Sequence, residues 1–416
     1  MSPWASTDGA SAPFLTALFT AVSAVCVTGL IVVDTPVFWS GFGQVVILVL
    51  FQIGGLGIMT GATLLTIMVG RRFQLSRRLI AQAETKSVSL GDVGGVLRLV
   101  VMVTFAVELI FALVIGLRLH FTYGEDWRSS LWHGVFQSVS AFNNAGFSSY
   151  SDSLMGFALD PWILGPLMLG VVIGGLGFPV MYELRQNPRN WPAWSIHTKL
   201  TLFGTALLLL VGFVGTAAYE WNNDATLGHF GAGGRMMNAA VHSVMARTAG
   251  FNSVDIGAMR TETLALTYGL MLIGGGSAGT AGGIKVTTFF LLGFIVWAEI
   301  RGHSDTVAFR RRVSVGAQRQ ALSVALLAAA VIGVATLLML SVTDLALEDV
   351  LFEVISAFAT VGLSTGITAD LPATGQLILI VLMFVGRVGT ITIATALALN
   401  ERHLPYRYPE ERPIVG

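Results

Sequence analysis

Apolar stretches long enough to cross a lipid bilayer recur along the whole chain. A helix needs about 20 consecutive apolar residues to span the hydrocarbon core. Of the 416 residues, 54% are hydrophobic and 12% are charged, which leaves too few polar groups to cover the surface of a soluble protein. The sequence therefore predicts an all-α polytopic membrane protein. The clearest spanning stretches are 45–70, 93–117, 200–218, 321–342 and 377–399.

The basic residues are unevenly placed. Seventeen of the 24 Lys and Arg residues fall in 71–98, 185–199, 301–319 and 402–412, and connections poor in basic residues separate these segments. The positive-inside rule places all four on the cytoplasmic side of the plasma membrane, together with the C-terminus. The formal net charge is zero, so no bulk basic character suggests a nucleic-acid partner.

Four short segments resemble one another. They are "LFTAVSAVCVTGL" (18–30), "VFQSVSAFNNAGF" (135–147), "NAAVHSVMARTAGF" (238–251) and "LFEVISAFATVGL" (351–363), and each holds a glycine before Leu or Phe. Six residues before that glycine stands Ser23, Ser140 or Ser356, with Val244 in the third segment. A second glycine cluster begins 24 to 28 residues after each glycine. Such periodicity predicts one unit repeated four times in parallel orientation.

Each unit is expected to contain a long helix, a short pore helix, a glycine turn and a second long helix. The short helices cannot cross a bilayer, and re-entrant backbone is tolerated only where it is buried in protein or lines a watery cavity. Four helix–pore helix–helix units around a pseudo-four-fold pore meet this condition. The predicted units are 1–92, which lacks its first long helix, 93–196, 197–316 and 317–416.

The four glycine turns form a candidate cation filter. Glycine permits backbone conformations that direct successive carbonyl oxygens toward an axis, where they can replace the hydration shell of K⁺. No acidic side chain lies in the turns, which favours a dehydrated monovalent ion over a divalent one. For any one turn, a glycine needed only for close packing of a loop is the simpler interpretation. Four glycines at matching positions in four repeats favour a filter instead. The filter candidates are Val27, Thr28, Gly29, Asn143, Asn144, Ala145, Gly146, Thr248, Ala249, Gly250, Thr360, Val361 and Gly362.

"IGGGSAGTAGGIKVTT" (273–288) interrupts a long apolar stretch with six glycines. Such a segment is a poor transmembrane helix, and it is predicted to unwind and cross beneath the filter as a gate. Arg387 lies near the centre of the last apolar stretch, where a charge is usually functional or paired. A packing kink with a structurally paired arginine is the alternative. The gate candidates are Gly274, Gly275, Gly276, Ser277, Ala278, Gly279, Thr280, Gly282, Gly283, Lys285 and Arg387.

These motifs together resemble the Trk/Ktr/HKT superfamily of potassium transporters, and most of all its Ktr-type pore subunit. "VTGL", "SAFNNAGFS", "RTAGFNS" and "ATVGLSTG" are similar to the four filter segments, and "GRVGTIT" to the arginine-bearing last helix. The resemblance implies K⁺ uptake, often stimulated by Na⁺, by a homodimer with one pore per protomer. It also implies a cytosolic ring of RCK-type nucleotide-binding subunits. No cofactor is expected in this chain.

The first unit departs from the family pattern. A spanning helix precedes the first pore helix in the family, whereas only 13 residues precede Phe14 here. Either the true start lies upstream or the first unit lacks an outer wall, and we favour an upstream start.

Two other functions stay open at this point. "GGSAG" (275–279) matches the G-x-S-x-G elbow of serine hydrolases, which need a histidine as general base. A secondary transporter for another small solute would also contain broken helices, although usually in two inverted halves. Glu108 faces either a protein contact or the pore. Spacing alone does not distinguish K⁺ from Na⁺.

Overall fold

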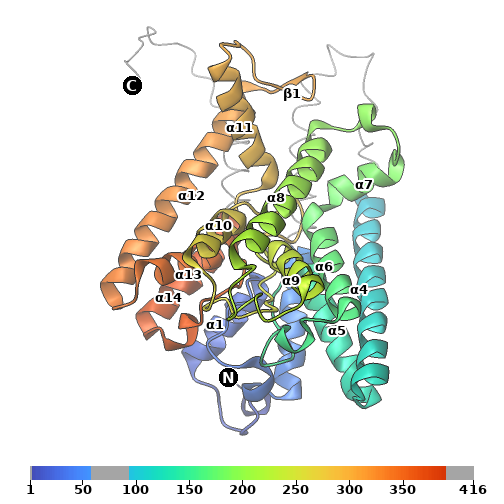
Figure 1. Cartoon of the computed structure of the whole chain (residues 1–416), viewed down its shortest axis with the longest axis vertical. Coiled ribbons are helices and arrows are strands. Elements are labelled where there is room, and N and C mark those ends of the chain that lie inside the picture. The colour runs from blue at the N-terminus through green and yellow to red at the C-terminus, as the bar shows by residue number, and fades with distance from the viewer. Residues whose placement is uncertain (1, 58–92, 390–416) are drawn as a thin grey trace.

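The computed structural model describes residues 2–57 and 93–389 (Figure 1). Residues 71–92 of the predicted basic segment 71–98, the whole basic segment 402–412, and the ends of the apolar stretches at 45–70 and 377–399 lie outside this range. The helices are α1 (Phe14–Val25), α2 (Thr35–Phe38), Gly41–Gly57, α4 (Val93–Tyr123), α5 (Trp127–Asn143), α6 (Pro161–Leu176), α7 (Phe178–Gln186), α8 (Ile196–Glu220), α9 (Ala232–Met245), α10 (Thr261–Leu272), α11 (Val286–Ile300), α12 (Val315–Val342), α13 (Leu347–Ala359) and α14 (Ala373–Phe384), followed by a π-helical turn (Val385–Gly389). The only strands in the described part are β1 (Val307–Ala308) and β2 (Arg311–Arg312), and 3₁₀ turns lie at Pro3–Ala5, Met155–Phe157, Trp191–Ala193 and Ile367–Asp370.

Long apolar helices form the outer wall of the molecule. In the described part, α4, α8 and α12 are each long and apolar enough to cross a membrane. Helices α6 and α7 supply a fourth span if their two halves are counted together, with a 92° bend between them. The bend is at Gly177, whose φ of 87° is a left-handed conformation that a side chain would disfavour. These spans confirm a mostly helical protein with several membrane-crossing segments.

Four short helices lie among the long ones. Helices α1, α5, α9 and α13 contain 12, 17, 14 and 13 residues, too few to cross a bilayer. Each packs against the apolar helices around it: α1 against α14, α5 against α4 and α6, α9 against α8 and α6, and α13 against α12 and α14. The first turn of α5 is capped by Asp126, whose carboxylate accepts backbone N–H bonds from Arg128 and Ser129. Each short helix ends just before one of the glycine turns.

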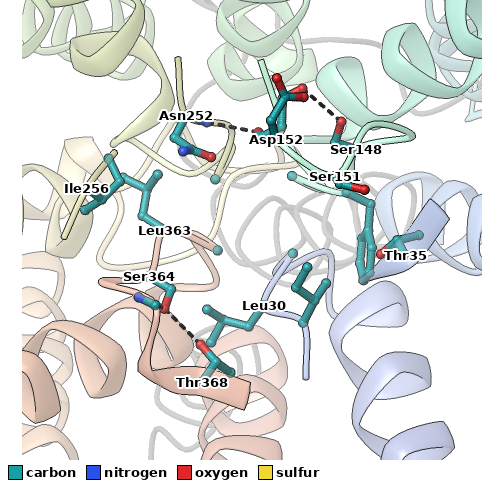
Figure 2. Close-up of a pocket in the computed structure, with 18 of the residues that line it drawn as sticks. Leu30, Thr35, Ser148, Ser151, Asp152, Asn252, Ile256, Leu363, Ser364 and Thr368 are labelled. Atoms are coloured by element: carbon teal, nitrogen blue, oxygen red, sulfur yellow. Dashed lines mark hydrogen bonds between the residues drawn. The ribbon is translucent and has the colours of Figure 1, made fainter. Parts of the chain in front are cut away.

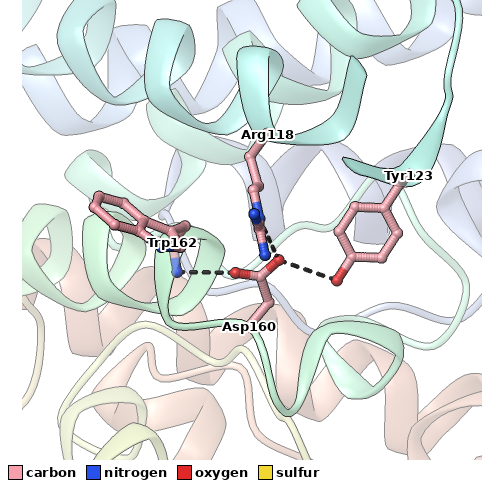
Figure 3. Close-up of polar contacts among 4 residues, drawn as sticks. All are labelled: Arg118, Tyr123, Asp160 and Trp162. Carbon is pink, nitrogen blue, oxygen red and sulfur yellow. Dashed lines mark hydrogen bonds and ion pairs between the residues drawn. The ribbon is translucent and has the colours of Figure 1, made fainter. Parts of the chain in front are cut away.

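A polar clamp joins α4 to the start of α6 (Figure 3). Asp160 Oδ2 accepts from Arg118 Nε at 2.8 Å and from the Tyr123 hydroxyl at 3.1 Å, while its Oδ1 caps α6 through the backbone N–H of Trp162. Asp160 itself is buried. Because these contacts fix the amino end of α6 against α4, they also fix α5, which packs between both helices.

A basic hairpin projects at the end of the molecule opposite α1 (Figure 1). Strands β1 and β2 pair antiparallel, and Phe309 at the turn packs its ring near those of Trp191, Phe203 and Phe294. The aromatic anchor holds in place a turn that carries three consecutive arginines, 310–312.

Candidate functional site

The four glycine turns come together in a closed ring. A Cβ atom added to Gly29 would meet the carbonyl oxygen of Ala145, one on Gly146 that of Ala249, one on Gly250 that of Val361, and one on Gly362 that of Thr28. All four separations would be under 3.0 Å, which real Cβ atoms essentially never show. Each turn therefore needs glycine because the next turn's backbone fills the space of a side chain. All four glycines also have positive φ values, between 69° and 94°.

Three of the turns are braced by a serine of their own short helix. In the first turn, Ser23 Oγ accepts a bond from the backbone N–H of Gly29 at 3.1 Å. Ser356 Oγ likewise accepts from the backbone N–H of Gly362 at 3.1 Å, and the Ser140 hydroxyl donates to the carbonyl oxygen of Phe147 at 2.7 Å. The third turn has Val244 at this position and therefore lacks the brace. The repeated serine in the sequence thus has a structural cause.

The third turn also differs in backbone conformation. The difference lies at the residue two places before each ring glycine. In the first, second and fourth turns this residue is Val27, Asn144 or Thr360, with φ values of 55°, 58° and 49°. In the third turn it is Thr248, with a φ of 143°. The side-chain amide of Asn144 lies 2.8 Å from Thr248 Oγ1 and links the second turn to the third. The side-chain oxygens of Thr28 and Thr360, in the first and fourth turns, are buried without a hydrogen-bond partner among the described residues.

The ring suits a cation on electrostatic grounds. The carbonyl oxygens that meet the glycines belong to the residues immediately before Gly29, Gly146, Gly250 and Gly362, so the same atom recurs in every turn. The carboxyl ends of α1, α5, α9 and α13 adjoin the ring, and helix carboxyl ends carry partial negative charge. Backbone oxygens and helix dipoles together favour a monovalent cation without a full negative charge in the turns.

A cavity of about 320 Å³ opens on one side of the ring (Figure 2). We call it the mouth cavity; all four ring glycines line it, as do the residues that follow them, such as Leu30, Ser148, Asn252 and Ser364. Asp34, Asp152 and Asp255 also lie on its wall. These carboxylates are separated from the ring but would raise the local concentration of cations at its entrance.

Tyr150 adds a neutral polar group to the mouth cavity. Its hydroxyl donates to Glu125 Oε1 at 2.9 Å. Burial, reinforced by this carboxylate, raises the pKa of the Tyr150 hydroxyl far above its usual range. The hydroxyl therefore keeps its proton and fixes the loop that carries Asp152.

The side chain of Asn143 points away from the ring. Its Nδ2 donates to Gln52 Oε1 at 2.6 Å and to Glu108 Oε1 at 3.1 Å, and Gln52 donates in turn to Glu108 Oε2. Glu108 is 3% exposed and its backbone carbonyl accepts from Ser138. Of the two predicted environments for Glu108, the structure places it in a protein contact behind α5.

Residues 273–285 are not helical, as the glycine content predicts. Helix α10 ends at Leu272 and α11 begins at Val286, and the loop between them (273–285) packs into the bend of α6. The backbone N–H groups of Gly276 and Thr280 donate to the carbonyls of Gly175 and Gly174, at 2.8 and 3.1 Å. The bent helix thus satisfies backbone groups that the broken α10–α11 span leaves open.

The loop contacts the short helices on the side of the ring opposite the mouth cavity. Thr280 Oγ1 lies 3.3 Å from the carbonyl of Phe142, in the last turn of α5. A Cβ on Gly282 would collide with the carbonyl of Ala359 and with Thr360 Oγ1. The residues that the loop contacts come before the ring glycines in the chain. The mouth cavity is lined by the ring glycines and by residues that follow them. The ring therefore lies between the mouth cavity and the loop.

Three basic side chains donate to carbonyl oxygens of this loop. Arg387 Nη1 reaches Thr280 at 2.5 Å, Lys285 Nζ reaches Ala281 at 2.6 Å, and Arg247 Nη2 reaches Gly274 at 2.7 Å. Arg387 and Arg247 are 4% and 6% exposed. Lys285 and Arg387 were candidates from the sequence. Arg247 was not among the residues predicted from the sequence. Its position directly before the third turn, in an otherwise apolar segment, is a signal that could have identified it.

Ser277, the candidate nucleophile of the G-x-S-x-G match, has no histidine beside it in the described part. Its Oγ lies 3.3 Å from Thr287 Oγ1. A hydroxyl cannot act as the general base that such a serine needs.

Taken together, the helical spans and the central ring define a multi-pass membrane transport protein. A model of a family described as cation transport protein, TrkH, matches residues 2–403. The chain therefore belongs to the TrkH family of cation transport proteins, and it is a transporter rather than an enzyme.

Individual relatives agree with this assignment. The Ktr system potassium uptake protein B of Bacillus subtilis is 39% identical over 404 residues, 97% of this chain and 90% of that protein. The protein of the same name from Vibrio alginolyticus is 38% identical and covers 96% of this chain and 88% of its own length. The crystal structure of the potassium transporter TrkH from Vibrio parahaemolyticus has the same fold, with a TM-score of 0.71 at 17% identity over 94% of this chain and 79% of that one.

Proposed function

We propose that this protein takes up K⁺ across the plasma membrane, with the ring of glycine turns as its selectivity filter. One observation carries the proposal: four segments far apart in the sequence close a ring in which each glycine lies against the carbonyl oxygen of the next turn. Backbone carbonyls in such a ring replace the hydration shell of a monovalent cation. The relatives named as potassium uptake proteins make K⁺ the first candidate ion.

The ring is built by four parallel units around a pseudo-four-fold pore. In this proposal each unit, 1–92, 93–196, 197–316 or 317–416, supplies a pore helix and a glycine turn, and its long helices form the wall. The packing of α5, α9 and α13 between long helices supports it. The mouth cavity with its three aspartates is the external entrance.

The segment 273–288, which comprises the loop (273–285) and the first residues of α11, is the gate of this pore. It lies against the ring from the side opposite the mouth cavity, and Arg387 and Lys285 place positive charge there. A permeating cation meets both the loop and the charges, so the closed loop forms a steric and electrostatic barrier. In the competing interpretation the loop is a packing kink and Arg387 only pairs with it.

A cytosolic RCK-type nucleotide-binding subunit controls the gate, and the transporter works as a homodimer with a cytoplasmic C-terminus. The basic segments 185–199 and 301–319 lie at the end of the molecule opposite α1, and the hairpin presents its arginines there (Figure 1). Ordinary topology signals account for part of this charge. Na⁺ stimulates uptake in the same proposal.

Rescue of growth tests the function directly. A host that lacks its own K⁺ uptake systems is grown in limiting K⁺ with this chain or an empty vector, with and without Na⁺. We expect rescue at low K⁺ and a faster rate with Na⁺. Purified protein in liposomes then separates transport from indirect effects: it should carry K⁺ but no uncharged solute. Rescue without ion flux in liposomes would contradict the proposal. Co-purification from the native cell tests the nucleotide-binding partner separately.

A further inference from the structure

The third glycine turn is held differently from the other three. Val244 takes the place of the bracing serine, and Thr248 has a φ of 143° where its counterparts lie between 49° and 58°. The backbone hydrogen bonds differ as well: Ala249 and Gly250 both donate to the carbonyl of Met245. The first, second and fourth turns instead bond to the carbonyl of the serine. Something other than a serine must therefore set the position of the third turn.

Arg247 makes the contact that replaces the brace. It directly precedes Thr248, is 6% exposed, and donates from Nη2 to the carbonyl oxygen of Gly274 at 2.7 Å. Gly274 is the first glycine of the loop, and its own N–H donates to the carbonyl of Ile284 across the base of the loop. The third turn is thus attached to the loop through one buried, charged side chain.

The charge of Arg247 makes this attachment costly to break. No acidic side chain forms an ion pair with it among residues 2–57 and 93–389. A buried guanidinium that loses a hydrogen-bond partner loses a charge-assisted bond and keeps its desolvation cost. A displacement of Gly274 therefore either pulls the third turn along or forces Arg247 to find another acceptor.

A small cavity lies beside Arg247. The cavity holds about 20 Å³, and Arg247, Thr248, Asn144, Thr205 and Gly275 are among the residues that line it. Arg247 Nε and Thr205 Oγ1 are buried without a hydrogen-bond partner in the described part. The volume suits one water molecule, which needs polar partners of this kind.

We propose that Arg247 couples the loop to the third turn, so that the position of the loop sets the ion selectivity of the ring. The coupling rests on the proposed function, in which the ring is the filter and the loop is the gate. With the loop in place, Arg247 holds the third turn in register with the three serine-braced turns, and the ring discriminates between K⁺ and Na⁺. With the loop displaced, the third turn alone loses its support and discrimination weakens.

A double-mutant cycle in liposomes tests the coupling. Arg247→Gln is combined with deletion of 276–282, and both K⁺ flux and the Na⁺/K⁺ flux ratio are measured for the four proteins. We expect Arg247→Gln to raise the Na⁺/K⁺ ratio several-fold in the intact protein. In the deletion protein the ratio is already raised, and Arg247→Gln adds nothing because the contact is already lost. Arg235→Gln, on the short helix that precedes Arg247 and bonded to the carbonyls of Phe230 and Gly228, is the matched control and leaves the ratio unchanged.

The outcomes separate the coupling from the gate. The coupling is overturned if the two changes raise the Na⁺/K⁺ flux ratio independently, so that their effects multiply in the double variant. It is also overturned if Arg247→Gln leaves this ratio unchanged. A deletion that leaves K⁺ flux unchanged overturns the gate, whatever the ratio does. If Arg247→Gln does not fold, hydrogen exchange decides the question without it: the deletion should speed exchange at Thr248 and Gly250, with the Ser23-braced first turn as the internal reference. Equal protection of both turns in the deletion protein would overturn the coupling.

Discussion

The guanidinium of Arg387 donates from Nη1 to the carbonyl oxygen of Thr280, 107 positions earlier in the chain and 2.5 Å away. The contact joins the π-helical turn after α14 to the loop between α10 and α11. Nε and Nη2 of the same side chain are buried without a partner in the described part. A buried charge with spare donors is ready to bind other carbonyls, which suits a contact that breaks and forms again.

Replacing Arg387 should release the loop. Arg387→Gln removes the charge and weakens the bond to Thr280, so we expect K⁺ flux in liposomes to rise. A charge-assisted hydrogen bond contributes about 1.5–3 kcal/mol, which corresponds to roughly a tenfold change or more in the closed-to-open ratio. Arg387→Lys keeps the charge and should give an intermediate flux. Wild-type flux in a folded Arg387→Gln protein would support the packing-kink interpretation instead.

The ring glycines should determine ion selectivity together. Serine at Gly29, Gly146, Gly250 or Gly362 places a Cβ against the carbonyl of the next turn, so the ring must widen or twist. We expect each variant to raise the K⁺ concentration for half-maximal uptake by about tenfold or more, or to raise the Na⁺/K⁺ ratio. Gly333→Ser in α12, where nothing lies within 4 Å of the added Cβ, is the control. Four variants with wild-type selectivity would remove the filter assignment.

The aspartates of the mouth cavity should act through their long-range field. Replacing Asp34, Asp152 and Asp255 with Asn keeps the side-chain shape but removes the negative charge at the entrance. We expect a higher half-saturation concentration for K⁺ at low ionic strength. The difference should shrink as salt is added, because the Debye length falls from about 30 Å at 0.01 M to about 10 Å at 0.1 M. Asp224→Asn, exposed and outside the cavity, should have no effect; a salt-independent defect in the triple variant would indicate a structural role instead.

The clamp at Asp160 should contribute to stability rather than to selectivity (Figure 3). Asp160→Asn loses the charge that binds Arg118 and weakens the cap of α6. We expect the free energy of unfolding to fall by about 1–3 kcal/mol. The measurement is the temperature at which the purified protein ceases to be monodisperse, which should be lower in the variant. The exposed pair of Arg312 and Asp305 gives the control, since Asp305→Asn should change stability by about 0–1 kcal/mol. A changed Na⁺/K⁺ ratio in Asp160→Asn would argue against a purely structural clamp.

Much of this fold could be predicted because membrane helices and repeats leave strong local signals. The apolar stretches predict the long helices, and the four similar segments, each with a glycine near its end, predict α1, α5, α9 and α13 with their turns. The break at 273–285 follows from its glycines. Arg247 illustrates what spacing does not reveal: its partner Gly274 is 27 positions away, and only the packed loop brings them together. The same holds for the order of the turns around the ring, which depends on long-range packing.

The last prediction concerns how closely the loop fits beneath the ring. Gly282 has no side chain, and a Cβ at this position would collide with the carbonyl of Ala359 and with Thr360 Oγ1, at the start of the fourth turn. The backbone of Ala359 cannot move away as a flexible side chain could. Gly282→Ala should therefore push the loop away from the ring and raise K⁺ flux.

Gly293→Ala is the matched control, since it makes the same change in α11, where nothing lies within 4 Å of the added Cβ. It should leave flux unchanged. If Gly282→Ala instead lowers flux while the protein stays folded, the displaced loop blocks the pathway and the seated loop is the conducting arrangement. Flux measured in liposomes at equal protein content distinguishes the two directions, because opening raises the rate and obstruction lowers it. A rise in Gly282→Ala together with a rise in Arg387→Gln would assign the barrier to the seated loop itself, since the two changes act on the loop at different residues.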